Sequence, residues 1–193
     1  MKTNKRMSTE TLVLGAILTG IVFLLQLLGS FIKLGPFSIS LVLIPIVIGA
    51  ASCGWKISTW LGFIFGVAVL VSGDAAAFLT IDVAGTIITV LLKGTACGLV
   101  AGLVYQLLAS KNRYLAVGAA ALVCPIVNTG VFLLGCFVFF LPAVEQWGAK
   151  DGFNNVFTYM ILGLVGGNFL VELAANVVLS PVIVRILRIR KKS

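Results

Sequence analysis

Residues Thr86 to Gly102 read TIITVLLKGTACGLVAG, and this stretch is apolar enough to cross a membrane although it carries a lysine, Lys93, near its middle. A charged side chain at membrane depth is costly, so Lys93 requires either a buried partner or a ligand. Which of the two it has is the question that the rest of the sequence must answer.

Composition places the chain among the polytopic membrane proteins. Of its 193 residues, 60% are hydrophobic and only 10% are charged, and long apolar stretches recur along the whole chain. A soluble domain of this length needs a more polar surface than these residues supply. The net charge of +8 sits mainly at the ends of apolar segments. That distribution is typical of membrane topology and not of a nucleic-acid-binding surface.

Six apolar segments are expected to form the transmembrane helices of a single domain, residues 1–193. They span residues 12–32, 41–54, 57–72, 83–109, 114–141 and 156–187. Lysine and arginine gather at the two ends of the chain and in the turns at 54–56 and 110–113, whereas the other connections hold most of the acids. Because basic residues stay on the cytoplasmic side, the sequence predicts an all-α membrane protein with six transmembrane helices and both termini cytoplasmic. We expect it in the cell membrane.

Polar side chains occur at about the same depth in three of the predicted spans. Lys93 is roughly ten residues into its span, or about 15 Å at the helical rise. The set comprises Thr89 and Lys93 in the fourth span, Asn128 in the fifth, and Asn168, Glu172 and Asn176 in the sixth. Spacings of three or four residues put the members of one span on one helical face. Lipid cannot satisfy such groups, so we expect them to face the interior of the bundle.

This polar layer is interpreted first as a pocket for a small polar molecule, with Lys93 facing an anionic group and the asparagines orienting the ligand. Aromatic side chains of the outer connections can cover such a ligand: Phe37, Phe78, Trp147 and Phe153. Of these, Trp147 is assigned to the site. Two alternatives stay open. One is a structural ion pair between Lys93 and Glu172, with the asparagines in interhelical hydrogen bonds, and the other is a proton or ion relay.

No enzyme activity is expected. The chain has no histidine and no H-E-x-x-H motif, and Asp74 and Asp82 flank a loop instead of sharing one helical face. The cysteines lie in or beside apolar segments without a CxxC pair, so no metal site and no cofactor are predicted. No phosphate-binding glycine loop occurs outside a span. Energy for uphill transport would therefore come from a partner or an ion gradient.

Small residues at four-residue spacing predict closely packed helix faces. These sets are Ala16 with Gly20, Gly62 with Gly66, Gly94 with Gly98 and Gly102, and Gly163 with Gly167. Such faces let two backbones approach in a bilayer, either within the chain or against a partner.

Several stretches, taken in order, resemble the substrate-binding S components of energy-coupling factor (ECF) vitamin transporters. They are LGPFSISLVLIPIVIGAASCGWKISTWLGFIFGVAVL (34–70), LLKGTACGLVAGLVY (91–105), the region of Asn128, and GNFLVELAANVVLSPVIVRIL (167–187). The resemblance covers nearly the whole chain and is greatest to the riboflavin, folate and pantothenate branch.

The resemblance implies a binding subunit. In that family the substrate binds near the outer face, and a transmembrane T component with two cytosolic ATPases drives uptake while the S component topples in the membrane. Small residues on the first helix dock the T component, and the matching positions are Ala16 and Gly20, with glycine in place of the usual second alanine. Lys93 then favours an anionic, vitamin-like substrate such as pantothenate, folate or lipoate.

Two other functions remain open at this point. The chain could act alone as a proton-coupled secondary carrier that uses Lys93 and Glu172, or it could be a structural subunit without a ligand. Internal repeats, which many carriers contain, are not evident in the sequence.

Overall fold

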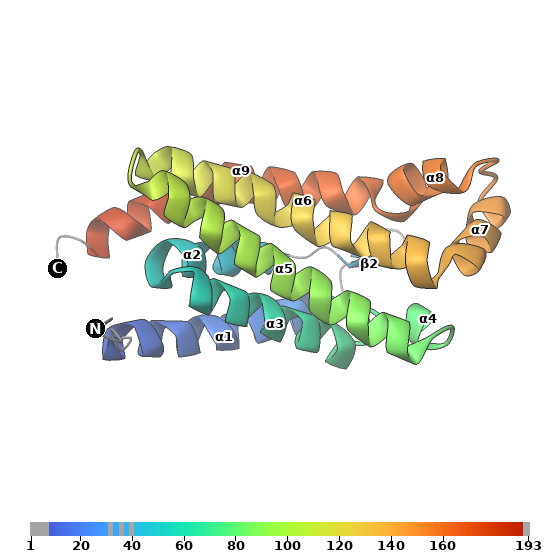
Figure 1. The fold of residues 1–193 in the computed structure, drawn as a ribbon, viewed down its shortest axis with the longest axis horizontal. Helices are drawn as coiled ribbons and strands as arrows, with labels where there is room; N and C mark the ends of the chain where they lie inside the picture. The colour runs from blue at the N-terminus through green and yellow to red at the C-terminus, as the bar shows by residue number, and fades with distance from the viewer. Residues whose placement is uncertain (1–7, 31–32, 35–36, 39–40, 191–193) are drawn as a thin grey trace, which may run out of the picture.

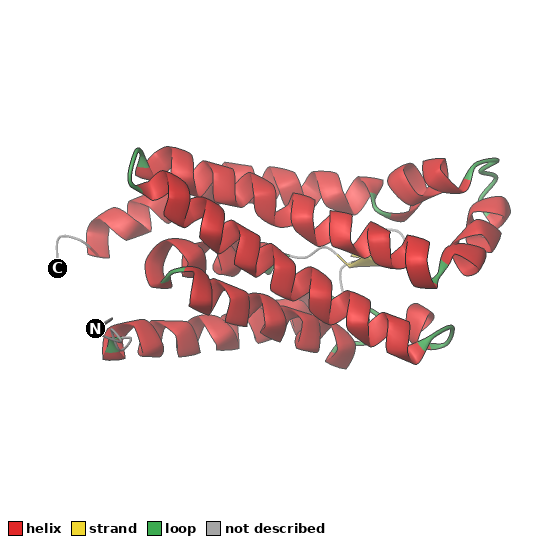
Figure 2. Ribbon diagram, viewed as in Figure 1, coloured by secondary structure: helices red, strands yellow, loops and turns green. Residues whose placement is uncertain are grey.

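The computed structural model describes residues 8–30, 33–34, 37–38 and 41–190, and nearly all of them are helical (Figure 2). The helical elements are α1 (Thr9–Gly29), α2 (Leu43–Cys53), α3 (Trp55–Val71), α4 (Ala76–Leu79), α5 (Val83–Ala109), α6 (Arg113–Phe139), α7 (Leu141–Lys150), α8 (Val156–Thr158), the π-helix η1 (Tyr159–Leu164) and α9 (Gly166–Arg190). Between α1 and α2, β1 (Lys33–Leu34) and β2 (Phe37–Ser38) pair antiparallel.

Polar caps and one glycine explain several of the helix boundaries. The Ser8 hydroxyl accepts a hydrogen bond from the Thr11 N–H at 3.2 Å, and Asn112 Oδ1 accepts one from the Tyr114 N–H at 2.9 Å. These caps satisfy N–H groups that have no partner within the helix. Gly54 alone joins α2 to α3, and its φ of 88° is one that other residues rarely adopt.

Long apolar helices dominate the described chain. Four of its helices are long and apolar enough to cross a membrane: α1, α5, α6 and the Gly166–Ile183 part of α9. The helices α2 and α3 are apolar but shorter, at 11 and 17 residues. The prediction of an all-helical membrane protein is confirmed at this level. The count of six spans and the cytoplasmic termini stay predictions.

The helices form an elongated bundle with two distinct ends. Figure 1 shows the start of α1, the α2–α3 connection, the α5–α6 connection and the end of α9 at one end. The short helices α4, α7 and α8 lie at the other end. The basic turns predicted to be cytoplasmic and the acidic connections predicted to be extracellular are thus at opposite ends.

Some predicted boundaries are wrong. The connection expected at residues 142–155 contains α7, which begins at Leu141. Pro142 is favourable in its first turn, where a backbone N–H has no partner within the helix. The turn expected at 54–56 is Gly54 alone, since α3 begins at Trp55. The sixth predicted span, 156–187, is divided into α8, η1 and α9. Residues 31–32 of the first predicted span lie outside the described residues.

The α3–α5 contact is made by glycines from both helices. A Cβ atom on Gly62 would collide with the Gly94 carbonyl oxygen, and one on Gly98 would collide with the Ser58 carbonyl oxygen. The Ser58 hydroxyl donates to the Gly98 carbonyl at 2.7 Å. Two of the predicted small-residue faces therefore pack against each other within the chain and form a rigid support for α5.

Candidate functional site

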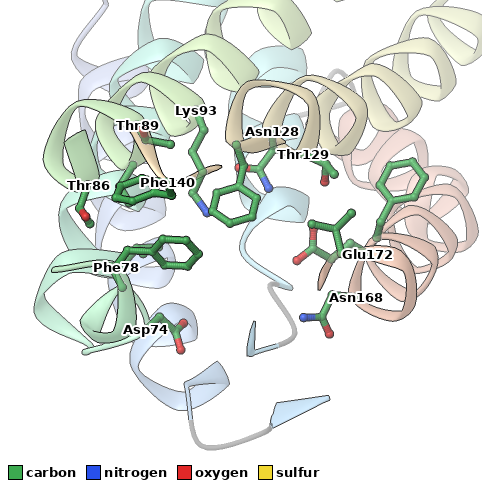
Figure 3. Close-up of a pocket in the computed structure, with 16 residues that line it drawn as sticks. Asp74, Phe78, Thr86, Thr89, Lys93, Asn128, Thr129, Phe140, Asn168 and Glu172 are labelled. Atoms are coloured by element: carbon green, nitrogen blue, oxygen red, sulfur yellow. The ribbon is translucent and has the colours of Figure 1, made fainter. Parts of the chain in front are cut away.

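A cavity of about 70 Å³ lies where α5, α6 and α9 meet near α4. Figure 3 shows side chains from these elements pointing into it. Its polar lining residues are Asp74, Thr86, Thr89, Lys93, Asn128, Thr129, Asn168 and Glu172. Five of the seven residues assigned to substrate binding from the sequence line this cavity: Thr89, Lys93, Asn128, Asn168 and Glu172.

Lys93 extends from α5 into the cavity, where its ammonium lies against two aromatic rings. Nζ is 5.2 Å from the ring centroid of Phe132 and 5.6 Å from that of Phe65. Both distances are within the range of cation–π attraction. The carboxylates of Glu172 and Asp74 line the same cavity and attract the ammonium. Within the described part of the chain, the ammonium is thus contacted by aromatic faces and attracted by two carboxylates.

Four buried oxygen atoms have no hydrogen-bond partner among the described residues: Thr89 Oγ1, Asn128 Oδ1, Asn168 Oδ1 and Asn176 Oδ1. The first three belong to residues that line the cavity. Asn128 and Asn168 are only 5% and 8% exposed. Each unsatisfied buried polar group costs about 1–3 kcal/mol. A cavity wall with several such groups is suited to a polar ligand whose own groups supply the missing hydrogen-bond partners.

Asn176 is fully buried one turn further along α9 and is not among the residues that line the cavity. Its Nδ2 donates to the backbone carbonyl of Glu172 at 2.9 Å. The four-residue spacing of Asn168, Glu172 and Asn176 does place them on one face, but α9 continues past the cavity before it reaches Asn176.

Asp74 is a lining residue that the sequence did not single out. It precedes α4, and its Oδ2 accepts a hydrogen bond from Gln26 Nε2 of α1 at 2.6 Å. Gln26 is itself buried. An acid in a short connection has no helical periodicity that reveals where it points, so only the fold places it. Asp82, at the other end of the same connection, does not line the cavity.

Aromatic rings separate the cavity from a second hollow closer to the end of the bundle. The Phe78 ring centroid lies 4.9 Å from that of Phe140, 5.6 Å from that of Phe132 and 5.4 Å from that of Trp147. Trp147 lines the outer hollow, which shares Asp74 and Phe78 with the inner cavity. Aromatic rings therefore lie between Trp147 and the inner cavity that contains Lys93.

Phe153, another predicted covering aromatic, does not line the inner cavity. Phe153 packs against Tyr159, with ring centroids 5.4 Å apart. Phe37 belongs to β2, and its side chain lies outside what the structure describes. Phe132 and Phe140 do line the cavity and were not predicted, because apolar residues in a membrane helix carry no signal that separates a pocket wall from a lipid face.

Comparison with known proteins identifies the family. The sequence model of the family "ECF transporter, substrate-specific component" matches residues 10–184. The chain belongs to this family. A search of curated proteins and a search of solved structures each find no match to the chain.

As an ECF S component, the protein is the substrate-binding subunit of an importer. S components bind small molecules and work with a T component and ATPase modules, so the chain belongs to a transport family and not to a class of enzymes. The polar cavity is the feature of the described chain that fits this role, since it combines charged, amide and aromatic groups.

The helix face assigned to T-component docking lies on the outside of this S component. Ala16 and Gly20 are exposed on α1, and a Cβ atom added to Gly20 would meet no atom within 4 Å. By contrast, Gly163 lies against the rings of Tyr159 and Phe153. The set on α1 is thus available to a partner chain or to lipid, and Gly167, which is exposed with no atom within 4 Å of an added Cβ, is available as well.

Proposed function

We propose that this S component captures a vitamin-like small molecule through an anionic group held against Lys93. The observation that carries the proposal is the position of the Lys93 ammonium in a cavity, with aromatic rings as its described contacts. An anionic group of a ligand would add charge-assisted hydrogen bonds that phenyl rings cannot make. Thr89, Asn128 and Asn168 would orient the ligand through their buried polar groups.

The membrane arrangement proposed for this function has six spans in a single domain, residues 1–193, with both termini cytoplasmic. The gathering of basic turns at the end of the bundle opposite α4 and α7 supports it (Figure 1). In this orientation the cavity lies in the extracellular half of a bacterial plasma membrane. Pantothenate, folate and lipoate are anionic molecules of the kind that is proposed.

Substitution of Lys93 tests the proposed binding site. The wild-type chain is purified, the small molecule that accompanies it is identified by native mass spectrometry, and its affinity is measured by titration calorimetry. Lys93→Met should weaken binding by about 10- to 100-fold, because a hydrogen bond to a charged group contributes about 1.5–3 kcal/mol.

Lys56→Met is the matched control. Lys56 also lies over an aromatic ring, 5.8 Å from the Trp55 centroid, but at the other end of the bundle and exposed. Its loss should leave the affinity unchanged. Equal affinities of the Lys93→Met variant and the wild type would exclude Lys93 as the anion-binding group.

Uptake experiments test the proposed partners, a T component and two cytosolic ATPases that form a shared energising module. Gly20→Leu, or Ala16→Leu, should block uptake by cells but preserve ligand affinity of the isolated chain, because bulk on this face prevents close helix contact. Uptake that survives both substitutions would place the docking face elsewhere. Transport by the lone chain in liposomes, driven by a pH gradient without ATP, would favour a secondary carrier instead.

A further inference from the structure

The cavity presents groups of opposite charge on different walls. Lys93 reaches in from α5, Asp74 from the segment before α4, and Glu172 from α9. Figure 3 shows the three side chains pointing toward the interior of the cavity from three sides. Glu172 is only 6% exposed, so its carboxylate is largely removed from bulk solvent.

A ligand whose only charge is negative would use Lys93 but neither carboxylate of the described wall. An anionic group gains from Lys93, but the described wall also carries two carboxylates that repel it. Charges interact more strongly in a low-dielectric interior than in water, so the sign of the charge on each wall of the cavity matters. The asparagine amides favour neither a negative nor a positive ligand group, because an Asn side chain both donates and accepts hydrogen bonds.

The remaining wall is aromatic. Phe78 meets Phe132 at an interplanar angle of 86° and Phe140 at 69°, so rings of different orientation surround the space between the charged groups. Aromatic rings of this kind bind a flat apolar body through stacked or edge-to-face contacts. They also shield the charged contacts from water, which strengthens them.

We infer that the ligand of this S component is amphoteric, with an anionic group for Lys93 and, across a flat apolar body, a protonated amine or N–H-rich group for Asp74 and Glu172. The anionic half of this inference rests on the proposed function, and the cationic half goes beyond it. Asp74 accepts the Gln26 hydrogen bond, and an N–H group of a ligand would add to it, because a carboxylate accepts several hydrogen bonds.

Three matched probes test the anionic and the cationic part of this inference separately. 4-(Aminomethyl)benzoate carries both charges on one ring, 4-methylbenzoate carries only the anion, and 4-methylbenzylamine carries only the cation. Binding to the purified full chain is measured by titration calorimetry after removal of any accompanying ligand. The zwitterion should bind about tenfold more tightly than either single-charge probe, since about 1.4 kcal/mol from the additional charged contact is a factor of ten.

Isosteric variants then test whether the two carboxylates bind the cationic group of the ligand. Asp74→Asn and Glu172→Gln should each reduce the preference for the zwitterion over 4-methylbenzoate. Asp74→Asn keeps an oxygen that can accept from Gln26, so the link to α1 is retained. Glu145→Gln, which removes an exposed carboxylate of α7 outside both hollows, should leave the preference unchanged.

The outcomes distinguish this inference from the proposed function. If 4-methylbenzoate binds as tightly as the zwitterion in the wild type, or if no probe binds at millimolar concentration, the amphoteric ligand is excluded. Binding of 4-methylbenzoate that depends on Lys93 would still support the anion site. If Lys93→Met leaves the binding of all three probes unchanged, the proposed anion site itself is wrong.

Discussion

The two faces of α5 meet their neighbours in opposite ways, although Lys93 and Gly94 are adjacent in sequence. Toward α3, Gly94 and Gly98 bring backbone against backbone, with no space for even one methyl group. Toward α6 and α9, Thr89 and Lys93 border a cavity with oxygen atoms that find no hydrogen-bond partner among the described residues. One face of α5 thus forms a closely packed backbone interface. Its other face is polar and borders groups that lack hydrogen-bond partners among the described residues.

The comparison separates the face of α5 that holds the helices together from the face that is proposed to bind a ligand. Between membrane helices the hydrophobic effect gives little, so close backbone packing holds them together. The glycine face supplies this packing and keeps α5 in place. While this packing holds α5 in place, the polar face retains groups without hydrogen-bond partners among the described residues. These are the groups proposed to contact a ligand.

The largest expected effect on stability comes from adding a methyl group to the glycine interface. Gly62→Ala should lower the free energy of unfolding by about 3 kcal/mol, because the new Cβ collides with backbone atoms that cannot rotate away. Reversible unfolding in detergent measures this.

Gly130→Ala in α6 is the control, since a Cβ atom there meets nothing within 4 Å. It should gain up to about 1 kcal/mol from helix propensity. Similar stabilities of the Gly62→Ala and Gly130→Ala variants would show that α3 and α5 are not in backbone contact.

An intermediate effect is expected where the polar face is made apolar. Asn128→Leu keeps the number and branching of the side-chain heavy atoms but removes a buried oxygen that has no hydrogen-bond partner among the described residues. The ligand-free protein should be more stable by about 1 kcal/mol, while ligand affinity falls by about tenfold. Thermal unfolding and titration calorimetry measure the two changes. The exposed Asn154→Leu serves as the control, and a loss of stability in ligand-free Asn128→Leu would contradict an unsatisfied amide.

The smallest effect is expected at the outer hollow. Trp147→Ala removes an edge-to-face contact with Phe78 but no group that lines the inner cavity, so affinity should fall by about threefold. Trp60→Ala, which removes an exposed tryptophan packed on Phe63, is the control. A loss of affinity as large as that of Lys93→Met would extend the binding site into the outer hollow.

Periodicity explains what the sequence could predict. Thr89 and Lys93 share a face, as do Asn168 and Glu172, and lipid excludes such groups from its side of a helix. Five of the seven assigned residues therefore line one cavity. The glycine spacings predicted tight faces, but which face meets which depends on tertiary contacts that spacing does not encode.

Three residues lie elsewhere relative to the cavity than the sequence led us to expect, because helical spacing does not determine the extent of a cavity. Trp147 was expected in a loop over the ligand, but α7 holds it in the outer hollow. Asp74 lies in a connection whose direction depends on the α3–α4 geometry and on Gln26. Asn176 follows the pattern of its helix beyond the depth of the cavity. Helix spacing predicts a face, whereas the extent of a cavity along that face depends on the neighbouring helices.

An experimental structure of the purified chain with the small molecule that accompanies it is the most direct test of the binding site. The predicted result is a ligand between α5, α6 and α9 whose anionic group lies about 2.7–2.9 Å from Lys93 Nζ, the usual length of a charge-assisted N–H···O bond. A cavity without a ligand, in which the Lys93 ammonium forms a direct ion pair with Glu172, would contradict the proposal and favour a structural role for both residues.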